Sequence, residues 1–553
     1  MNRPESIQTE QSSSAAWWRR AVVYQVYIRS FADGDGDGTG DLAGLRARLD
    51  HLVELGIDAV WVNPWYPSPL ADGGYDVVDH RDIHPDFGTL AGADALIAEV
   101  HDRGLRILID LVPNHTSIEH PWFQAALGAG PGSPERQRYI FRNGRGPDGD
   151  EPPTNWRAVF GGSAWTRVDD GQWYLHIFDT SQPDLNWQHP EVRDEFDDIF
   201  RFWLDRGVDG FRIDVAHGMI KDLSFPDVAV DRLDERGQRT PDGSHPHWDR
   251  DELHVLIRRW RAVLDDYDDR MMVAEANVHP DRLPLYLRPG EYHQSFNFDL
   301  LKADWSADDF RSIIDGAASR AAAIGAASTW VLSNHDIVRH ATRYGLPPGT
   351  DYERWLLDGP HEVLDAEAGA RRARAAVMVT LALPGSAYIY QGDELGLPEV
   401  WDLPIEVLED PTWERSNHTV KGRDGCRVPI PWAKDGPSFG FGPGPAWLAQ
   451  PPIFGDLSVE AQDGDPSSTL NLYRTAISLR RDLFRRDEEL EILDLGTDVL
   501  AFRRGSGATV VVNMGSAPLP AADLPADEIV LSSEPLIDTD LPPDTSIWFA
   551  PPA

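Results

Sequence analysis

The stretch VRDEFDDIFRFWLDRGVDGFRID, residues 192–214, contains the repeating unit that decides the predicted fold. Its first part places apolar side chains at i, i+4, i+7, i+8, i+11 and i+12, the spacing of one buried helical stripe. That stripe consists of Val192, Phe196, Ile199, Phe200, Trp203 and Leu204. Gly207 is expected to end the helix. The following GFRID has the pattern of a short buried strand.

The same alternation of short apolar runs with helix-period segments recurs along most of the chain. It is typical of βαβ units around a parallel sheet, in a barrel or a doubly wound arrangement. The apolar runs span residues 22–28, 58–63, 106–112, 210–214, 271–276, 294–298, 329–334 and 387–391. Because there are eight such runs, we predict an α/β fold of the (β/α)₈ TIM-barrel type.

Two connections are too long for ordinary barrel loops. Residues 116–185, after the third run, are rich in Gly, Pro, Arg and Trp and are predicted to form an inserted subdomain. Residues 393–465 are expected to fold as a rim loop. The barrel is therefore assigned to residues 17–115 and 186–485. Residues 486–553 are predicted to form a small all-β, sandwich-like C-terminal domain, and residues 1–16 a disordered N-terminus.

Composition excludes several classes of function. The 553 residues contain 51 Lys and Arg against 91 Asp and Glu, a net charge of −40, so nucleic acid and anionic membranes are not expected partners. The single cysteine, Cys426, allows no intrachain disulfide and no thiolate zinc site. No run approaches the apolar length of a membrane span. We predict a cytoplasmic protein, as a monomer or small homo-oligomer.

Polar residues end five of the apolar runs abruptly, and a parallel barrel brings such residues together at one face. A single Asp at a strand end is usually a helix cap or a turn former, but five such endings together indicate a site. They are the residues of DLVPNH (110–115), Arg212 and Asp214, Glu275, His335 and Asp336, and Asp393 with Glu394.

Two of these carboxylates have the settings that glycoside hydrolysis requires. Arg212 and Asp214 are two apart on a strand and share a face, so the guanidinium should keep Asp214 ionised as a nucleophile. Glu275 follows the apolar run Met-Met-Val-Ala, and burial on such a wall favours the protonated form that a general acid needs. A close-set pair of this kind gives retention through a covalent glycosyl-enzyme. From the residue types alone, a structural ion-pair network is an equal alternative.

Five short motifs carry a resemblance to a known family. DLVPNH (110–115), GFRIDVAHG (210–218), AEAN (274–277) and SNHD (333–336) resemble, in order, the four shared motifs of the α-amylase family, glycoside hydrolase family thirteen. QPDLN (182–186) resembles the extra motif of the inserted domain, and GGYDV near residue 75 also matches. The similarity runs from about Trp17 to the C-terminus and is strongest to the α-glucosidase and oligo-1,6-glucosidase branch.

The resemblance implies roles for individual residues. Asp214 would be the nucleophile, Glu275 the acid/base and Asp336 a third carboxylate that holds sugar hydroxyls. Tyr75 would stack on the glucose ring. The other implied substrate-binding residues are Asp76, His115, Phe178, Arg212 and His335, with Val215 influencing the choice of linkage. Charged groups suit sugar hydroxyls, and aromatic rings suit sugar faces.

The run DGDGDGTGD, residues 33–41, predicts a metal site. D-x-D-x-D-G presents three carboxylates and a sharp turn to a hard cation, although Gly44 stands where an EF-hand would have its bidentate Glu. The alternative is a Gly/Asp turn before a helix that Asp41 caps. Similar loops bind structural calcium in the resembled branch. We therefore predict structural Ca²⁺ with the ligands Asp33, Asp35, Asp37, Thr39 and Asp41.

The substrate is predicted from the long segments that could wall a pocket. A closed pocket suits an exo-acting, retaining α-glucosidase, and we favour short α-1,4-linked glucosides such as maltose and malto-oligosaccharides, with α-1,6 or sucrose cleavage as alternatives. Trp401, Trp413 and Trp432 are candidates for aromatic cover. Trehalose or isomaltulose synthases and transglucosylases share the resembled framework and stay open. A non-catalytic relative would lose members of the carboxylate triad, and none is lost here.

Overall fold

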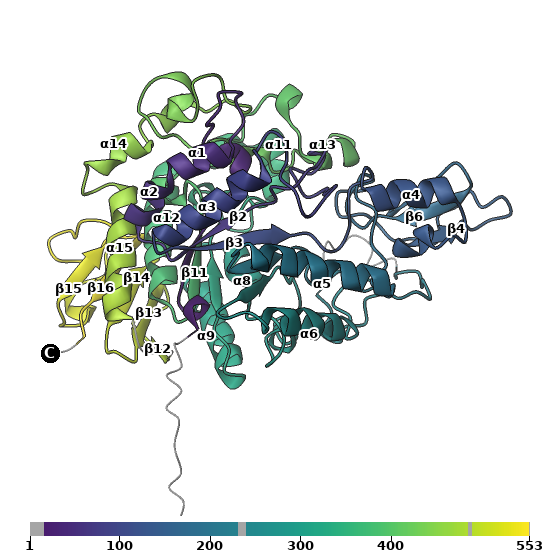
Figure 1. The fold of residues 1–553 in the computed structure, drawn as a ribbon. Helices are drawn as coiled ribbons and strands as arrows, with labels where there is room; N and C mark the ends of the chain where they lie inside the picture. The colour runs from purple at the N-terminus through teal and green to yellow at the C-terminus, as the bar shows by residue number, and fades with distance from the viewer. Residues whose placement is uncertain (1–15, 230–238, 485–488, 552–553) are drawn as a thin grey trace, which may run out of the picture.

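The computed structural model describes residues 16–229, 239–484 and 489–551. A central barrel lies between two smaller parts: α4 with a three-stranded sheet at one end of the molecule, and a five-stranded sheet at the opposite end (Figure 1). The predicted disordered segment, residues 1–16, lies outside the described residues apart from its last residue.

The barrel contains the eight predicted strands, all parallel. In spatial order they are β10 (Thr329–Val331), β11 (Ser386–Tyr390), β1 (Val22–Val26), β2 (Ala59–Val62), β3 (Arg106–Leu111), β7 (Gly210–Ile213), β8 (Met271–Ala274) and β9 (Gln294–Ser295). The two end strands approach each other where the Thr329 hydroxyl donates to the Ser295 carbonyl. The prediction of a (β/α)₈ barrel is therefore confirmed.

Alternate residues of the strands serve two different cores. On β1, Val22, Tyr24 and Val26 belong to the large core outside the barrel, whereas Val23 belongs to the core inside it. The inner core also holds Trp61, whose ring stacks on Phe296 at 5.5 Å and 29°. This period of two is what strands buried on both faces require.

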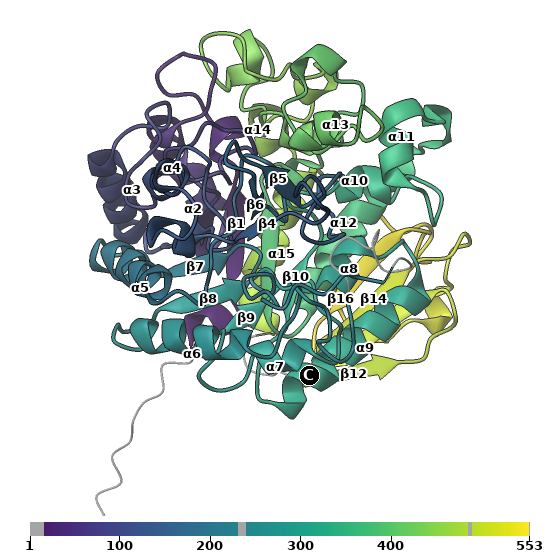
Figure 2. The ribbon, with the colours of Figure 1, turned by 90° about the vertical axis from the view of Figure 1, so that its right-hand side faces the viewer.

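Helices surround the strands, as Figure 2 shows in a view turned by 90° from that of Figure 1. They are α1 (Leu42–Ala47), α2 (Leu49–Leu55), α3 (Leu90–Asp102), α5 (Pro190–Asp205), α6 (Leu253–Leu264), α7 (Leu283–Tyr286), α8 (Phe298–Lys302), α9 (Ala307–Ala323), α10 (His340–Arg343), α11 (Tyr352–Asp358), α12 (Ala366–Ala382) and α15 (Thr469–Leu483). The whole predicted stripe of α5 is buried. Gly207 follows the helix with a φ of 102°, which confirms it as the stop.

The segment after β3 forms α4 (Pro121–Ala129) and an antiparallel sheet in the order β4 (Phe141–Asn143), β6 (Gln172–Leu175), β5 (Trp165–Arg167). Trp156, Trp165 and Leu175 of this segment share a small apolar core with Val215 and Trp248 of the barrel loops. The insertion is thus packed directly beside the residue that follows Asp214.

The segment after β11 is folded, as predicted. It contains α13 (Pro411–Arg415) and α14 (Val459–Asp463) and packs against the Asp/Gly-rich loop of residues 33–41. The Asp33 amide donates to the Phe441 carbonyl at 2.8 Å, and the Trp447 amide donates to the Gly38 carbonyl at 3.0 Å. These bonds tie the rim of the barrel to its first long loop.

The C-terminal part is one antiparallel sheet in the order β12 (Leu490–Leu493), β13 (Val499–Arg504), β14 (Thr509–Asn513), β16 (Thr545–Phe549), β15 (Ile529–Ser532). One face packs on the barrel helices, where the Trp548 indole donates to the Met378 carbonyl of α12. Leu541 covers the other face. The described residues therefore differ from the expected sandwich, because helices replace a second sheet. Among them, no helix is both long and apolar enough to cross a bilayer.

Candidate active site

A cavity of about 430 Å³ opens at the carboxyl ends of the barrel strands. It brings together side chains from the strand ends with side chains from the insertion and the rim segment. Of the predicted site residues, it is lined by Tyr75, His115, Phe178, Asp214, Val215, Glu275, His335 and Asp336. The mouth of the barrel is therefore the candidate site, as the strand-end motifs predicted.

Arg212 is the centre of the site. It lies on β7 directly opposite Asp110 of β3 and is 2% exposed. Its Nη1 donates to Asp110 at 2.6 Å and to Asp214 at 2.7 Å, and its Nη2 lies 2.9 Å from Oε2 of Glu275. One planar guanidinium thus holds three carboxylates, so the predicted nucleophile and acid/base are close-set.

Backbone contacts fix the two catalytic candidates just beyond their strands. The Asp214 amide donates to the Leu111 carbonyl at 2.9 Å, and the Glu275 amide donates to the Ile213 carbonyl at 3.0 Å. The Val215 amide in turn donates to Oε2 of Glu275 at 2.9 Å. The parallel ladder therefore continues for one residue beyond each strand and sets both carboxylates at the cavity.

The ionisation of Asp214 depends on more neighbouring charges than the sequence predicted. Burial raises the pKa of its carboxyl well above the ordinary value; Arg212 opposes the rise, and Glu275 and Asp110 add to it. Burial also raises the pKa of Asp110 to about 7 against the same guanidinium. The expectation that Arg212 alone keeps Asp214 ionised is incomplete, because Asp110 and Glu275 contact the same guanidinium and their charges oppose ionisation of Asp214.

Asp336 has the opposite electrostatic setting. Burial acts to raise its pKa, but His335, Arg423 and Arg427 together hold that pKa well below the ordinary value. Arg423 Nη1 lies 2.9 Å and Arg427 Nη2 3.2 Å from Oδ1 of Asp336. Asp336 is therefore a fixed negative charge at the cavity, which suits a carboxylate that accepts hydrogen bonds from sugar hydroxyls.

Tyr75 and His335 form one stacked unit. Their rings lie 5.2 Å apart at 5°, and the Tyr75 hydroxyl lies 2.7 Å from Nε2 of His335. That hydroxyl also donates to Asp110 and accepts from Asn63, while Gln25 contacts Nδ1 of His335 at 2.7 Å. Asn63 and Gln25 were missed from the sequence, although Asn63 ends one apolar run and Gln25 is the polar residue inside another.

His115 and Phe178 meet at the insertion side of the cavity. Their rings are 5.3 Å apart, and His115 Nε2 lies 3.0 Å from the Tyr75 carbonyl. Burial lowers the pKa of His115 to about 3, so the imidazole is neutral near neutral pH. Both residues therefore line the cavity, and their contact with a sugar stays a prediction.

The prediction for Asp76 is wrong in its geometry. The Asp76 carboxylate is fully buried away from the cavity, and its oxygens accept from the Ser68 hydroxyl and from the amides of Ala71 and Asp72. Asp72 lines the cavity instead. Because this loop turns between the two positions, the neighbour of Tyr75 that reaches the site is three residues before it.

Arg423 was also missed, and no strand or motif in the sequence marks it. It comes from the rim segment and donates from Nη2 to Asp72 at 2.7 Å and from Nη1 to Asp336 at 2.9 Å. Its Nε is bonded to Asp410, and its guanidinium lies 5.0 Å above the Phe160 ring. This ion-paired group joins the loop of Tyr75 to the rim across one side of the cavity.

The three predicted tryptophans do not cover the cavity. Trp432 is packed in the main core against Phe31, and Trp401 stacks on His361 at 3.8 Å. The aromatic lining is Tyr75, Phe160, Phe178, Trp248, Phe298 and Tyr352. Trp413 packs against His418 with the ring centres 4.8 Å apart, and both Trp401 and Trp413 are half-buried.

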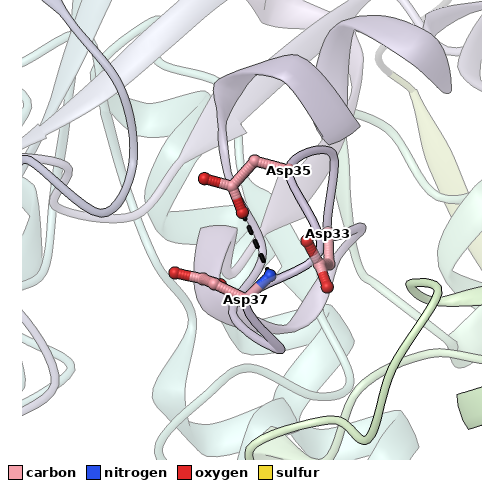
Figure 3. A group of neighbouring side chains, drawn as sticks. All are labelled: Asp33, Asp35 and Asp37. Atoms are coloured by element: carbon pink, nitrogen blue, oxygen red, sulfur yellow. Dashed lines mark hydrogen bonds between the residues drawn. The ribbon is translucent and has the colours of Figure 1, made fainter.

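The structure groups three of the carboxylates that were predicted to bind a metal. Carboxylate oxygens of Asp33, Asp35 and Asp37 lie within 4.8 Å of one another (Figure 3). Asp41 instead caps α1, with its two oxygens accepting from the amides of Gly44 and Gly34. The three grouped aspartates suit a hard cation, although their oxygens also accept from backbone amides of the loop, and Asp41 is not part of the group.

Comparisons with known proteins identify the family of the chain. A model of the alpha amylase catalytic domain matches residues 25–487. A probable alpha-glucosidase of Rhizobium meliloti (strain 1021) is 38% identical, over 89% of this chain and 87% of that protein. The oligo-1,6-glucosidase of Parageobacillus thermoglucosidasius is 34% identical, over 94% of each. The trehalulose synthase MutB from Pseudomonas mesoacidophila MX-45 superposes with a TM-score of 0.83 at 31% identity, covering 97% and 99% of the two chains.

The barrel, the carboxylates at its mouth and these matches define a carbohydrate-active enzyme of the TIM-barrel class. The chain belongs to the alpha-amylase family and is a glycoside hydrolase.

Proposed function

We propose that this enzyme is a retaining, exo-acting α-glucosidase that removes terminal glucose from short oligosaccharides such as maltose. One observation carries the proposal: the ion pair between Arg423 and Asp72 lies at one side of the cavity beside Asp336. A barrier behind the glucose site leaves room for one sugar there, whereas an endo-acting enzyme needs a cleft that continues.

The chemistry follows from the placement of two carboxylates. An oxygen of Asp214 attacks the anomeric carbon as the bond to the leaving oxygen breaks, and Glu275 gives its proton to that oxygen. The Glu275 carboxylate then takes a proton from water, and that water displaces Asp214 from the glucosyl-enzyme. Two displacements restore the α configuration. The reaction requires the proton of the carboxylate cluster around Arg212 to reside on Glu275, with the negative charge on Asp214.

The leaving-group side sets the linkage. Val215 lines the cavity directly after Asp214 and holds an unusual φ of 47°. Such a conformation is strained for a β-branched residue, and its amide is used by Glu275. We favour α-1,4 cleavage, with α-1,6 and sucrose cleavage as the alternatives that the relatives' names support.

A substrate panel tests this function. Maltotriose labelled at its reducing end should give unlabelled glucose and labelled maltose as the first products. Labelled glucose appearing first, or cleavage that skips the terminal bond, would contradict exo action from the non-reducing end. Initial rates on maltose, isomaltose and sucrose rank the linkages, and maltose should be fastest.

Sugar transfer or isomerisation is the second candidate. The aromatic side chains Phe178, Trp248 and Phe298 line the cavity and could retain a sugar while water is excluded. The similarity to a trehalulose synthase supports this alternative. Sucrose converted to an isomeric disaccharide faster than to glucose and fructose would favour it over hydrolysis.

We also propose that Asp33, Asp35 and Asp37 hold one structural Ca²⁺, with the Thr39 carbonyl as a further ligand. A bound cation would reduce the electrostatic repulsion among three neighbouring carboxylates and would stabilise the loop that packs on the rim segment. Removing calcium with EGTA should lower the melting temperature of the wild type. It should have no effect on an Asp35→Asn, Asp37→Asn double variant. An equal shift in both proteins would contradict the site.

A further inference from the structure

One cationic side chain on the cavity wall has no part in the catalytic network. Lys302 is the last residue of α8, lines the cavity, and lies with Nζ 5.9 Å from the centre of the Phe298 ring. Lysine is rare in this chain. Its four lysines are Lys221, Lys302, Lys421 and Lys434.

The ammonium of Lys302 has no direct ion pair among the described residues, unlike the other cation of the cavity wall. Arg423 is paired with the three carboxylates of Asp72, Asp336 and Asp410. Across residues 16–229, 239–484 and 489–551, the Lys302 ammonium makes no ion pair and no hydrogen bond. Desolvation of the ammonium and the charge of Arg239 lower its pKa, although the side chain as a whole is exposed and the charges of Asp299 and Glu275 act in the opposite direction. A cation kept in this state has free hydrogen-bonding capacity toward the cavity.

Lys302 faces the side where the leaving group must lie. The charge of Glu275 acts on Lys302, and Glu275 is the proposed proton donor to the leaving oxygen. Asn277 lines the same wall, and its side-chain oxygen accepts from Nε of Arg239 at 2.8 Å. Arg239 is also paired with Asp299, so of the two cations in this group only Lys302 has no direct carboxylate partner.

We propose that this wall selects α-glucosides whose leaving group carries an anionic group, a carboxylate or a phosphate, and that Lys302 binds that group. The inference rests on the proposed glucosidase function and names a substrate class for it. The chain carries a net charge of −40, and its cavity is lined by several carboxylates, so an anionic substrate is repelled unless one group compensates. An unpaired lysine beside the leaving group supplies that compensation.

A matched pair of substrates tests the inference. Maltobionate and maltitol have the same glucosyl group and open-chain leaving groups that differ by a carboxylate. The wild type should prefer maltobionate in kcat/KM. Lys302→Met, which keeps the apolar stem, should reduce the ratio of maltobionate to maltitol by about tenfold, the effect of one charge contact of about 1.4 kcal/mol. The exposed Lys434→Met, which lies outside the cavity, is the control and should keep the wild-type ratio.

Two further arms define the outcome. Trehalose 6-phosphate and trehalose repeat the comparison for phosphate, and raising NaCl from 10 to 500 mM should shrink the wild-type preference for both anionic substrates. An unchanged ratio in Lys302→Met, or a wild-type preference for the neutral partners, would overturn the inference. Hydrolysis of p-nitrophenyl α-glucoside tests the glucosidase proposal separately, because its leaving group has no carboxylate or phosphate. If that substrate is not cleaved, both proposals fall.

Discussion

The two ends of the cavity are built in different ways. At the proposed glucose end, Arg212 and Asp214 lie on and directly after β7, whereas Tyr75 and His335 lie in the loops after β2 and β10. All four are buried and are joined by hydrogen bonds of 2.6–3.4 Å. At the leaving-group end, the lining comes from loops and short helices, and Lys302 there is free of ion pairs among the described residues. We expect changes at the glucose end to affect all substrates alike, and changes at the other end to alter their ranking.

The largest effect is expected at the nucleophile. Asp214→Asn should reduce turnover of every glucoside by about 10⁴-fold or more, because no other group can form the glycosyl-enzyme. The size of the side chain is kept, so the circular dichroism spectrum should match the wild type. Residual activity within tenfold of the wild type would break the assignment of the glucose end.

Variants of Asp72 and Asp76 test which of these two carboxylates lies at the cavity. Asp72→Asn should reduce kcat/KM by about 100-fold with a small change in melting temperature, because its charge faces the cavity and Arg423. Asp76→Asn should do the reverse. Its amide would meet the Ala71 and Asp72 amides, so the free energy of unfolding should fall by about 1–3 kcal/mol. If Asp76→Asn lost activity and kept its stability, Asp76 and not Asp72 would be the carboxylate at the cavity.

Much of the glucose end could be predicted from the sequence, because its residues lie at fixed places in a repeating unit. Asp214 and Glu275 each follow a buried strand of four residues, so their positions depend only on the period of the barrel. The pairing of Arg212 with Asp214 follows from the two-residue spacing along β7. The ladder then places these strand ends side by side.

The rest of the site could not be predicted in this way. Arg423 lies more than eighty residues after Asp336, on a segment without a helix or strand period, and only the fold brings the two together. The loop between Ser68 and Asp76 has no periodic pattern from which to predict whether Asp72 or Asp76 faces the cavity. The ionisation of Asp214 also depends on how many carboxylates contact Arg212. Asp110 is one of them, and only the register of β3 and β7 places it beside Arg212.

The leaving-group end should respond differently. Trp248→Phe removes part of a ring that stacks on His217 at 5.0 Å and lines the cavity. We expect the ratios of kcat/KM among maltose, isomaltose and sucrose to change by about three- to tenfold, since shape differences of this size are worth 1–3 kcal/mol at most. Trp401→Phe, away from the cavity, should keep the wild-type ranking. Equal losses on all three substrates would instead place Trp248 with the glucose end.

Asp393 is a buried carboxyl group that does not line the cavity, so it tests the effect of burial on stability alone. Burial raises the pKa of Asp393 from 3.8 to about 7, with Arg339 opposing. The folded state therefore keeps a proton that the unfolded chain has released, and stability should fall as pH rises from about 4 to 7. Asp393→Asn should remove on the order of 2 kcal/mol of that fall, measured as guanidinium midpoints at pH 4.5 and 7.5. The same slope in both proteins would contradict this setting.

The central claim is that Asp214 and Glu275, held by one guanidinium, cleave with retention. Time-resolved proton NMR of the enzyme with maltose reads this directly, from the anomeric signals over the first few per cent of conversion. We predict that α-glucose appears before mutarotation and that glucose accumulates at twice the rate of maltose loss. If β-glucose appears first, the carboxylates act through an inverting geometry and the account is wrong.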